Sequence, residues 1–168
     1  TVPVQSENEF NDFDQERLLH RKLSEEGPRI ISGDVNADGL PDLLLLGAAD
    51  DPNKLFLQKQ GGTFTQSSQQ AFINDKGLES TCAAFFDADG DGDLDLLVGH
   101  GGNERQKGIA NFYLRYYDND GKGNFVINLF RTPQVGGNLS TIAPADFDHD
   151  GDMDLFLGQL LMHLVIVK

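Results

Sequence analysis

The sequence predicts an all-β protein built from about three four-stranded repeats. Three observations lead to this prediction. A ten-residue acidic pattern with a central glycine occurs three times, short apolar segments flank each copy, and the copies recur at a similar period. The copies begin at residues 34, 87 and 146, so their spacing is 53 and then 59 residues. Periods near 50 residues are typical of repeat proteins that place similar sheets side by side.

The repeated pattern is a candidate metal-binding loop. It occupies residues 34–43, 87–96 and 146–155, with oxygen-bearing side chains at positions 1, 3, 5 and 9 and glycine at position 6. This alternation turns every second side chain toward one point, where a hard cation such as calcium finds oxygen ligands. The predicted side-chain ligands are Asp34, Asn36, Asp38, Asp42, Asp87, Asp89, Asp91, Asp95, Asp146, Asp148, Asp150 and Asp154. The predicted carbonyl ligands are Leu40, Asp93 and Asp152, and we expect the side chains of these two aspartates to face solvent.

The distribution of charge supports a cation at each loop. The chain has 27 acidic and 13 basic residues, and the loops hold three, five and five of the acids. Carboxylates packed this closely repel one another unless a cation lies among them. We therefore expect about three structural Ca²⁺ ions, which would change the formal net charge from −14 to −8.

The residues around each loop exclude an EF-hand. An EF-hand loop ends on a bidentate glutamate at position 12, whereas position 12 is Leu45, Val98 and Leu157 here. Short apolar runs precede the loops at 29–32, 81–86 and 141–145 and follow them at 43–46, 94–98 and 155–157. Runs of this length, stopped by glycine, favour buried strands, so each unit is predicted to be strand, loop, strand.

The sequence between loops has room for two further strands. Residues 54–57 and 63–65 follow the first loop, and residues 111–116 and 124–127 follow the second. Glycines in both connections are typical of hairpin turns. Four antiparallel strands per repeat make a β-propeller blade.

These features resemble FG-GAP repeats. The loops, with the segments Asn53-Lys-Leu-Phe-Leu and Gly62-Thr-Phe-Thr, are similar to calcium-bearing blades of integrin α-chain propellers and of bacterial VCBS/FG-GAP proteins. Such bacterial proteins often carry an ASPIC/UnbV domain and are related to cartilage acidic proteins. The resemblance covers most of residues 10–158 and implies the blade, not the function of the blade. A Phe-Gly pair before each loop, expected from the family, is missing.

The predicted units are a segment at 1–28, which suits the remnant of a preceding blade, a blade at 29–80, a blade at 81–135 and an incomplete blade at 136–168. We expect no room for outer strands in the third blade. Three blades do not close a ring, and each blade face needs a neighbour. Two explanations stay open: a partial propeller from a longer chain, or a ring closed by homo-oligomerisation in which the apolar tail at 160–167 supplies a strand to the partner.

Composition limits the remaining possibilities. The single cysteine, Cys82, excludes an internal disulfide and is predicted to be a small buried residue. No apolar stretch is long enough to span a membrane, and the negative charge disfavours nucleic acid as a partner. Loops of this type suit millimolar calcium, so we expect an extracellular, periplasmic or cell-surface location.

The predicted function is a non-enzymatic, calcium-binding module for extracellular protein interaction or adhesion. No nucleophile elbow, phosphate loop or HExxH motif is present. The alternative is a carbohydrate-binding module associated with a polysaccharide-processing enzyme, so the predicted partner is a protein or a glycan at the cell surface. The polar loop at 100–108 is the candidate ligand face. Its candidate contacts are His100, Asn103 and Arg105, with Tyr116 and Tyr117 as further sugar-contacting candidates.

Overall fold

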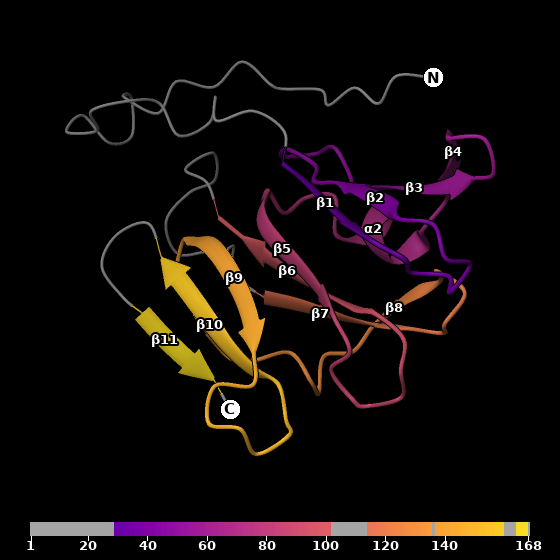
Figure 1. Ribbon diagram of the computed structural model, residues 1–168. Coiled ribbons are helices and arrows are strands. Elements are labelled where there is room, and N and C mark those ends of the chain that lie inside the picture. Colours follow the sequence, from indigo (N-terminus) through magenta and orange to yellow (C-terminus); the bar gives the residue numbers. More distant parts are fainter. Residues whose placement is uncertain (1–28, 102–113, 136, 160–163, 168) are drawn as a thin grey trace.

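The computed structural model describes residues 29–101, 114–135, 137–159 and 164–167. These residues form three antiparallel sheets and one short helix (Figure 1), so the predicted all-β, blade-like class is confirmed. The first sheet holds β1 (Ile30–Gly33), β2 (Asp42–Leu45), β3 (Lys54–Lys59) and β4 (Thr63–Ser67), followed by helix α2 (Gln70–Asn74). The second holds β5 (Ser80–Phe86), β6 (Asp95–His100), β7 (Leu114–Asn119) and β8 (Phe125–Ile127). The third holds β9 (Leu139–Ala145), β10 (Asp154–Gln159) and β11 (Leu164–Val167).

Each sheet is a meander in which neighbouring strands follow one another in sequence. The first strand of every sheet ends one residue before a predicted metal loop, and the second strand begins at position 9 of that loop. The register repeats accordingly, with Gly33 opposite Asp42, Phe86 opposite Asp95 and Ala145 opposite Asp154. The three loops therefore leave equivalent ends of β1, β5 and β9 and lie in a row along one edge of the molecule (Figure 1).

The third sheet differs from the prediction. Strand β11 pairs antiparallel with β10 over Leu155–Gly158, so the expectation that this unit has no room for an outer strand was wrong. The tail that was considered for pairing with another copy instead extends its own sheet. Strand β10 has a free edge, and the apolar segment that follows it in sequence is the nearest partner for its main-chain hydrogen bonds.

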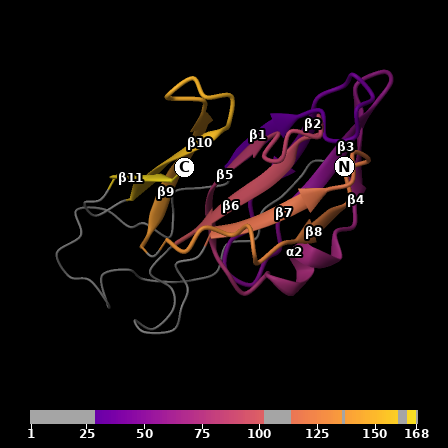
Figure 2. The ribbon, with the colours of Figure 1, turned by 90° about the horizontal axis from the view of Figure 1, so that it is seen from below.

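The sheets stack on one another through two apolar clusters. Leu44 and Leu55 of the first sheet, Leu96 and Tyr117 of the second, and Phe72 of α2 contribute to the first cluster. Alternate residues of the middle sheet point the other way, because successive strand side chains face opposite sides. The second cluster accordingly joins Leu97 and Tyr116 to the apolar residues of β9 and β10, among them Leu139 and Leu157. The middle sheet is thus covered on both faces, and every residue of β6 is buried (Figure 2).

The second and third sheets approach closely at Gly99. A Cβ atom at this position would lie 3.1 Å from the Leu139 Cβ atom of the third sheet and 2.5 Å from the sulfur of Cys82 on the paired strand β5. The Cys82 side chain is buried as predicted, with 5% exposure, and desolvation raises the pKa of its thiol to about 11. Glycine at residue 99 is therefore what lets the two sheets pack at this distance.

Helix α2 has five residues. Nowhere in the described ranges does a helix combine the length and the apolar character needed to cross a membrane.

Candidate metal centres

The first aspartate of each loop organises the turn. Its carboxylate accepts a hydrogen bond from the position-6 glycine: Gly39 N–H to Asp34 (2.8 Å), Gly92 N–H to Asp87 (3.1 Å) and Gly151 N–H to Asp146 (3.2 Å). These glycines have φ of 83°, 92° and 97°, a left-handed backbone that glycine adopts without steric cost. The same turn is therefore built three times from the same two residue types.

The carboxylates at alternate positions converge. In the second loop, oxygens of Asp87, Asp89 and Asp91 lie within 4.8 Å of one another, and in the third loop Asp146, Asp148 and Asp154 do so. In the first loop the Asp38 N–H lies 3.1 Å from both the Asp34 Oδ1 and the Asn36 Oδ1 atoms, so these two oxygens face the same amide. The second and third loops thus each bring three of the predicted carboxylates together, and in the first loop two predicted oxygens face one amide.

The aspartate at position 9 is held more firmly than the others. Asp42 and Asp95 are 0% and 2% exposed. Asp42 accepts hydrogen bonds from the N–H groups of Val35 (3.1 Å) and Gln58 (2.8 Å). Asp95 accepts them from Ala88 (3.4 Å) and Asn119 (2.9 Å). Each carboxylate therefore ties its loop to the third strand of its sheet.

Burial opposes the charge that these aspartates carry. Desolvation raises the pKa of Asp42 and of Asp95, although hydrogen bonds to both carboxylates act in the opposite direction. A nearby divalent cation would favour the charged forms. Without a cation, burial therefore favours the protonated form of the position-9 carboxylates, and a bound cation would reverse that preference.

Asp93 corrects one expectation. Its side chain was predicted to face solvent, but it is half-buried, and its Oδ1 atom is buried without a hydrogen-bond partner. Its Oδ2 atom lies 3.3 Å from the place where a side chain on Gly121 would begin, so Asp93 packs against the β7–β8 turn. Desolvation, followed by repulsion from Asp91, Asp95 and other carboxylates of the loop, raises the Asp93 pKa to about 6. Asp152, its counterpart in the third loop, is exposed.

The residues present fit a calcium ion. Every candidate ligand is an oxygen, which is the donor type that calcium prefers. The Oδ1 atom of Asp146, at position 1 of the third loop, is buried and has no hydrogen-bond partner. A buried carboxylate oxygen left in this state is costly, and a cation among Asp146, Asp148 and Asp154 would relieve that cost.

A family model for the FG-GAP-like repeat matches residues 34–98 and 103–157. The chain belongs to the FG-GAP-like repeat family. The two matched segments contain all three acidic loops, and FG-GAP-like repeats fit the blade-like sheets described above. A comparison with curated proteins found no match.

The described residues of the candidate ligand face in this FG-GAP-like chain are buried. His100 is the last residue of β6 and is 1% exposed, so it is not part of an exposed polar loop. Asn103 and Arg105 lie outside the described residues. Tyr117 is fully buried and donates a hydrogen bond to Asp75 (2.8 Å). Tyr116 is 3% exposed and donates its hydroxyl hydrogen to Asp95. The apolar strands on both sides draw these residues into the core, which a polar local sequence did not reveal.

The β7–β8 turn is a part of the site that sequence reasoning missed. The Asn119 side chain donates hydrogen bonds to the carbonyl oxygens of Val35 (2.8 Å) and Leu94 (3.0 Å), which belong to the first and second loops. Gly123 of the same turn packs near Val35 and Asn36. The segment reads as an ordinary hairpin turn, and only its density of Asn, Asp and Gly signalled a special backbone.

Proposed function

We propose that this chain is a calcium-stabilised, non-enzymatic interaction module. The observation that carries the proposal is the third loop, where oxygens of three carboxylates lie within 4.8 Å of one another and the Asp146 Oδ1 atom is buried without a hydrogen-bond partner. Calcium there would neutralise carboxylate repulsion and fix the hairpin between β9 and β10. Each ion would thereby stabilise a blade, and the stacked blades would present surfaces to a partner.

The proposal treats calcium as structural rather than catalytic. The position-9 aspartates accept backbone hydrogen bonds from the adjoining strand, so an ion at the loop would act on the whole sheet. Loops of extracellular modules bind calcium with dissociation constants on the order of 10⁻⁴–10⁻³ M. At a tenfold excess of calcium over that constant, each site would add roughly 1.4 kcal/mol to the free energy of unfolding.

The proposed location follows from the same affinity range. Calcium reaches millimolar concentration outside cells, and sites of this strength fill there. We propose that the chain works in an extracellular, periplasmic or cell-surface setting, with a protein as its partner. The carbohydrate alternative loses support because His100 and Tyr117 are buried.

The test uses the three glycine amides as separate reporters. Gly39, Gly92 and Gly151 each donate a hydrogen bond to the first aspartate of their own loop. Calcium added to ¹⁵N-labelled protein should therefore shift each amide resonance as its own loop fills. Thermal unfolding in calcium, magnesium and chelator provides the stability readout.

We expect all three amide resonances to shift with calcium and the melting temperature to rise. Magnesium should do less, because it keeps several of its waters and demands a smaller, more rigid site. Glycine resonances that stay unchanged at millimolar calcium would overturn the proposal.

A further inference from the structure

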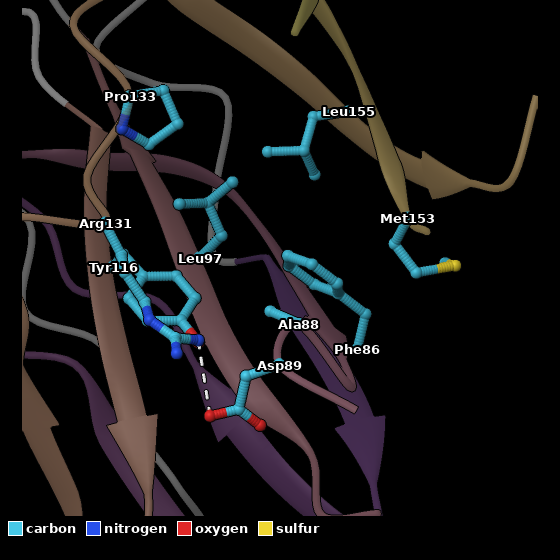
Figure 3. Close-up of a pocket in the computed structure, with 9 residues that line it drawn as sticks. All are labelled: Phe86, Ala88, Asp89, Leu97, Tyr116, Arg131, Pro133, Met153 and Leu155. Carbon is cyan, nitrogen blue, oxygen red and sulfur yellow. Dashed lines mark ion pairs between the residues drawn. The ribbon is translucent and has the colours of Figure 1, made fainter. Parts of the chain in front are cut away.

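A pocket of about 390 Å³ lies between the second and third sheets. Its walls come from β5, β6 and β7, from the second and third metal loops, from the segment after β8 and from the start of β10 (Figure 3). The lining residues are Phe86, Ala88, Asp89, Leu97, Tyr116, Arg131, Pro133, Met153 and Leu155. The pocket is close to the second loop because Asp89 is at position 3 of that loop.

The lining combines an apolar floor with one pair of charges. Phe86, Leu97 and Leu155 are buried and belong to the cluster between the two sheets. Among the lining residues that the structure describes, Arg131 is the only cation and Asp89 the only acid. A guanidinium group beside an apolar surface suits an anionic group, above all a carboxylate, carried on a compact apolar body.

The turn that carries Arg131 is well held. Asn128 accepts hydrogen bonds from the N–H groups of Phe130 (3.1 Å) and Arg131 (3.2 Å). The Thr132 hydroxyl donates to the Asn128 carbonyl (2.9 Å) and accepts from the Tyr116 N–H (3.3 Å). The backbone at Arg131 is therefore fixed against β7, and its side chain interacts with both Tyr116 and Asp89.

The acidic neighbour of Arg131 is a predicted calcium ligand. The Arg131 Nη1 atom lies 3.3 Å from the Asp89 Oδ2 atom (Figure 3), and the two side chains are 45% and 28% exposed. Asp89 also belongs to the cluster of converging carboxylates with Asp87 and Asp91. One carboxylate is thus shared between the metal loop and the pocket. A second link runs from the loop through Asp95 to Tyr116 of the pocket wall.

We propose that this pocket binds an organic carboxylate on an apolar body, and that calcium in the second loop makes Arg131 available for it. The inference rests on the proposed calcium binding. Without calcium, Asp89 pairs with Arg131 and occupies the only cation of the pocket. With calcium, Asp89 turns to the ion, and the Arg131 guanidinium, repelled by the ion, takes the carboxylate of a ligand whose apolar body lies on Phe86, Leu97 and Leu155.

The first experiment measures competition between Arg131 and calcium. Calcium is titrated into the Arg131→Gln variant, and binding is followed at the amides of Gly39, Gly92 and Gly151. We expect calcium affinity at Gly92 to rise about threefold, the scale of an exposed ion pair, with no change at the other two glycines. As a control, Lys122→Gln removes one positive charge from the neighbouring β7–β8 turn. It should change the calcium affinity at Gly92 less than Arg131→Gln does.

The second experiment measures the ligand, with 4-phenylbutanoate as probe and its neutral amide as control. Chemical-shift changes of Leu97 and Leu155 should show binding of the acid several-fold tighter in calcium than in chelator, and weak binding of the amide in both. Reciprocity requires the acid to raise calcium affinity at Gly92 by the same factor. Asp89→Asn should bind the acid in chelator, because Arg131 is then released without calcium.

The outcomes separate this inference from the proposed function. Shifts of the three glycine amides with calcium, together with equal binding of acid and amide, would overturn the pocket inference and leave the calcium module intact. Failure of Asp89→Asn to bind the acid in chelator would also overturn it, since the carboxylate would then need the ion itself rather than Arg131. An unchanged calcium affinity in Arg131→Gln would remove the coupling between the pocket and the loop.

Discussion

The side-chain amide of Asn119, at the end of β7 in the second sheet, lies 2.8 Å from the carbonyl oxygen of Val35 in the loop of the first sheet. The same amide group reaches the Leu94 carbonyl at 3.0 Å. One side chain at the end of β7 therefore joins the first metal loop to the second. Blades of this chain are connected by their loops as well as by the apolar clusters between their faces.

Replacing Asn119 should weaken two metal loops and spare the third. Asn119→Ala leaves the carbonyl groups of Val35 and Leu94 without their donor, and we expect it to destabilise the chain by about 2 kcal/mol. Calcium affinity should fall at the amides of Gly39 and Gly92 and stay constant at Gly151. The matched control is Asn124→Ala, because the Asn124 side chain bonds only to Asp120 within the same exposed turn. Equal effects of both variants would contradict a bridging role for Asn119.

The third loop allows a test in which charge is held constant. Asp148→Ala and Asp152→Ala each remove one negative charge, but only Asp148 has its carboxylate in the converging cluster. We expect Asp148→Ala to lower the melting temperature in calcium far more than in chelator. Asp152→Ala should change the melting temperature similarly in both buffers, because its predicted ligand is the backbone carbonyl. The measurement is the melting temperature of each variant in calcium and in chelator. Equal calcium dependence of the two variants would contradict the prediction.

The calcium-free chain should show a pH dependence that originates at Asp93. Its pKa is raised to about 6 in the folded chain, above the ordinary value of an aspartate, so the folded state binds the proton more tightly than the unfolded state. The stabilising effect of that proton is present below about pH 4 and is lost as the pH rises through about 6.

Asp93→Asn isolates this effect. In chelator the variant should match the original chain near pH 4 and melt at a higher temperature near pH 7. In calcium the difference at pH 7 should shrink, because the ion offsets the repulsion from the other carboxylates of the loop. A melting-temperature difference in chelator that is the same at pH 4 and pH 7 would show that Asp93 does not titrate in this range.

Gly99 should tolerate no side chain. A Cβ atom there would lie 2.5 Å from the sulfur of Cys82 on the paired strand β5 and 3.1 Å from the Leu139 Cβ atom of the third sheet, so Gly99→Ala must displace both neighbours, at a cost of about 1–3 kcal/mol. The double variant with Cys82→Ala should recover part of this loss, since the sulfur is the closest atom. Chemical denaturation of the two single variants and the double variant measures the coupling. Additive losses would mean that the sulfur is not the obstacle.

The loops and most strands were predictable because their signals are local. Asp-Gly spacing defines each loop, and the apolar runs beside it define β1, β2, β5, β6, β9 and β10. The outer strands β3, β4 and β8 followed from short apolar segments between glycine-containing turns. These features need no knowledge of what lies across the sheet.

The rest depended on contacts between distant residues. His100 looked polar and exposed, yet it is the final residue of a strand that is buried on both faces. Asn119 looked like a turn residue, and its role appears only when the first loop is placed beside it. Helix α2 is too short to have a helical period, and Arg131 meets Asp89 across 42 residues of sequence.

Because the three loops lie in a row along one edge, the negative charge of this chain is concentrated at that edge. Thirteen of its 27 acidic residues lie in the three loops, all at the same end of the inner strands, while the remaining acids nearly balance the 13 basic residues. Even with an ion in every loop, this edge keeps a net negative charge. A positively charged partner would be steered toward that edge from a distance, and the rate of the encounter would fall as salt is added.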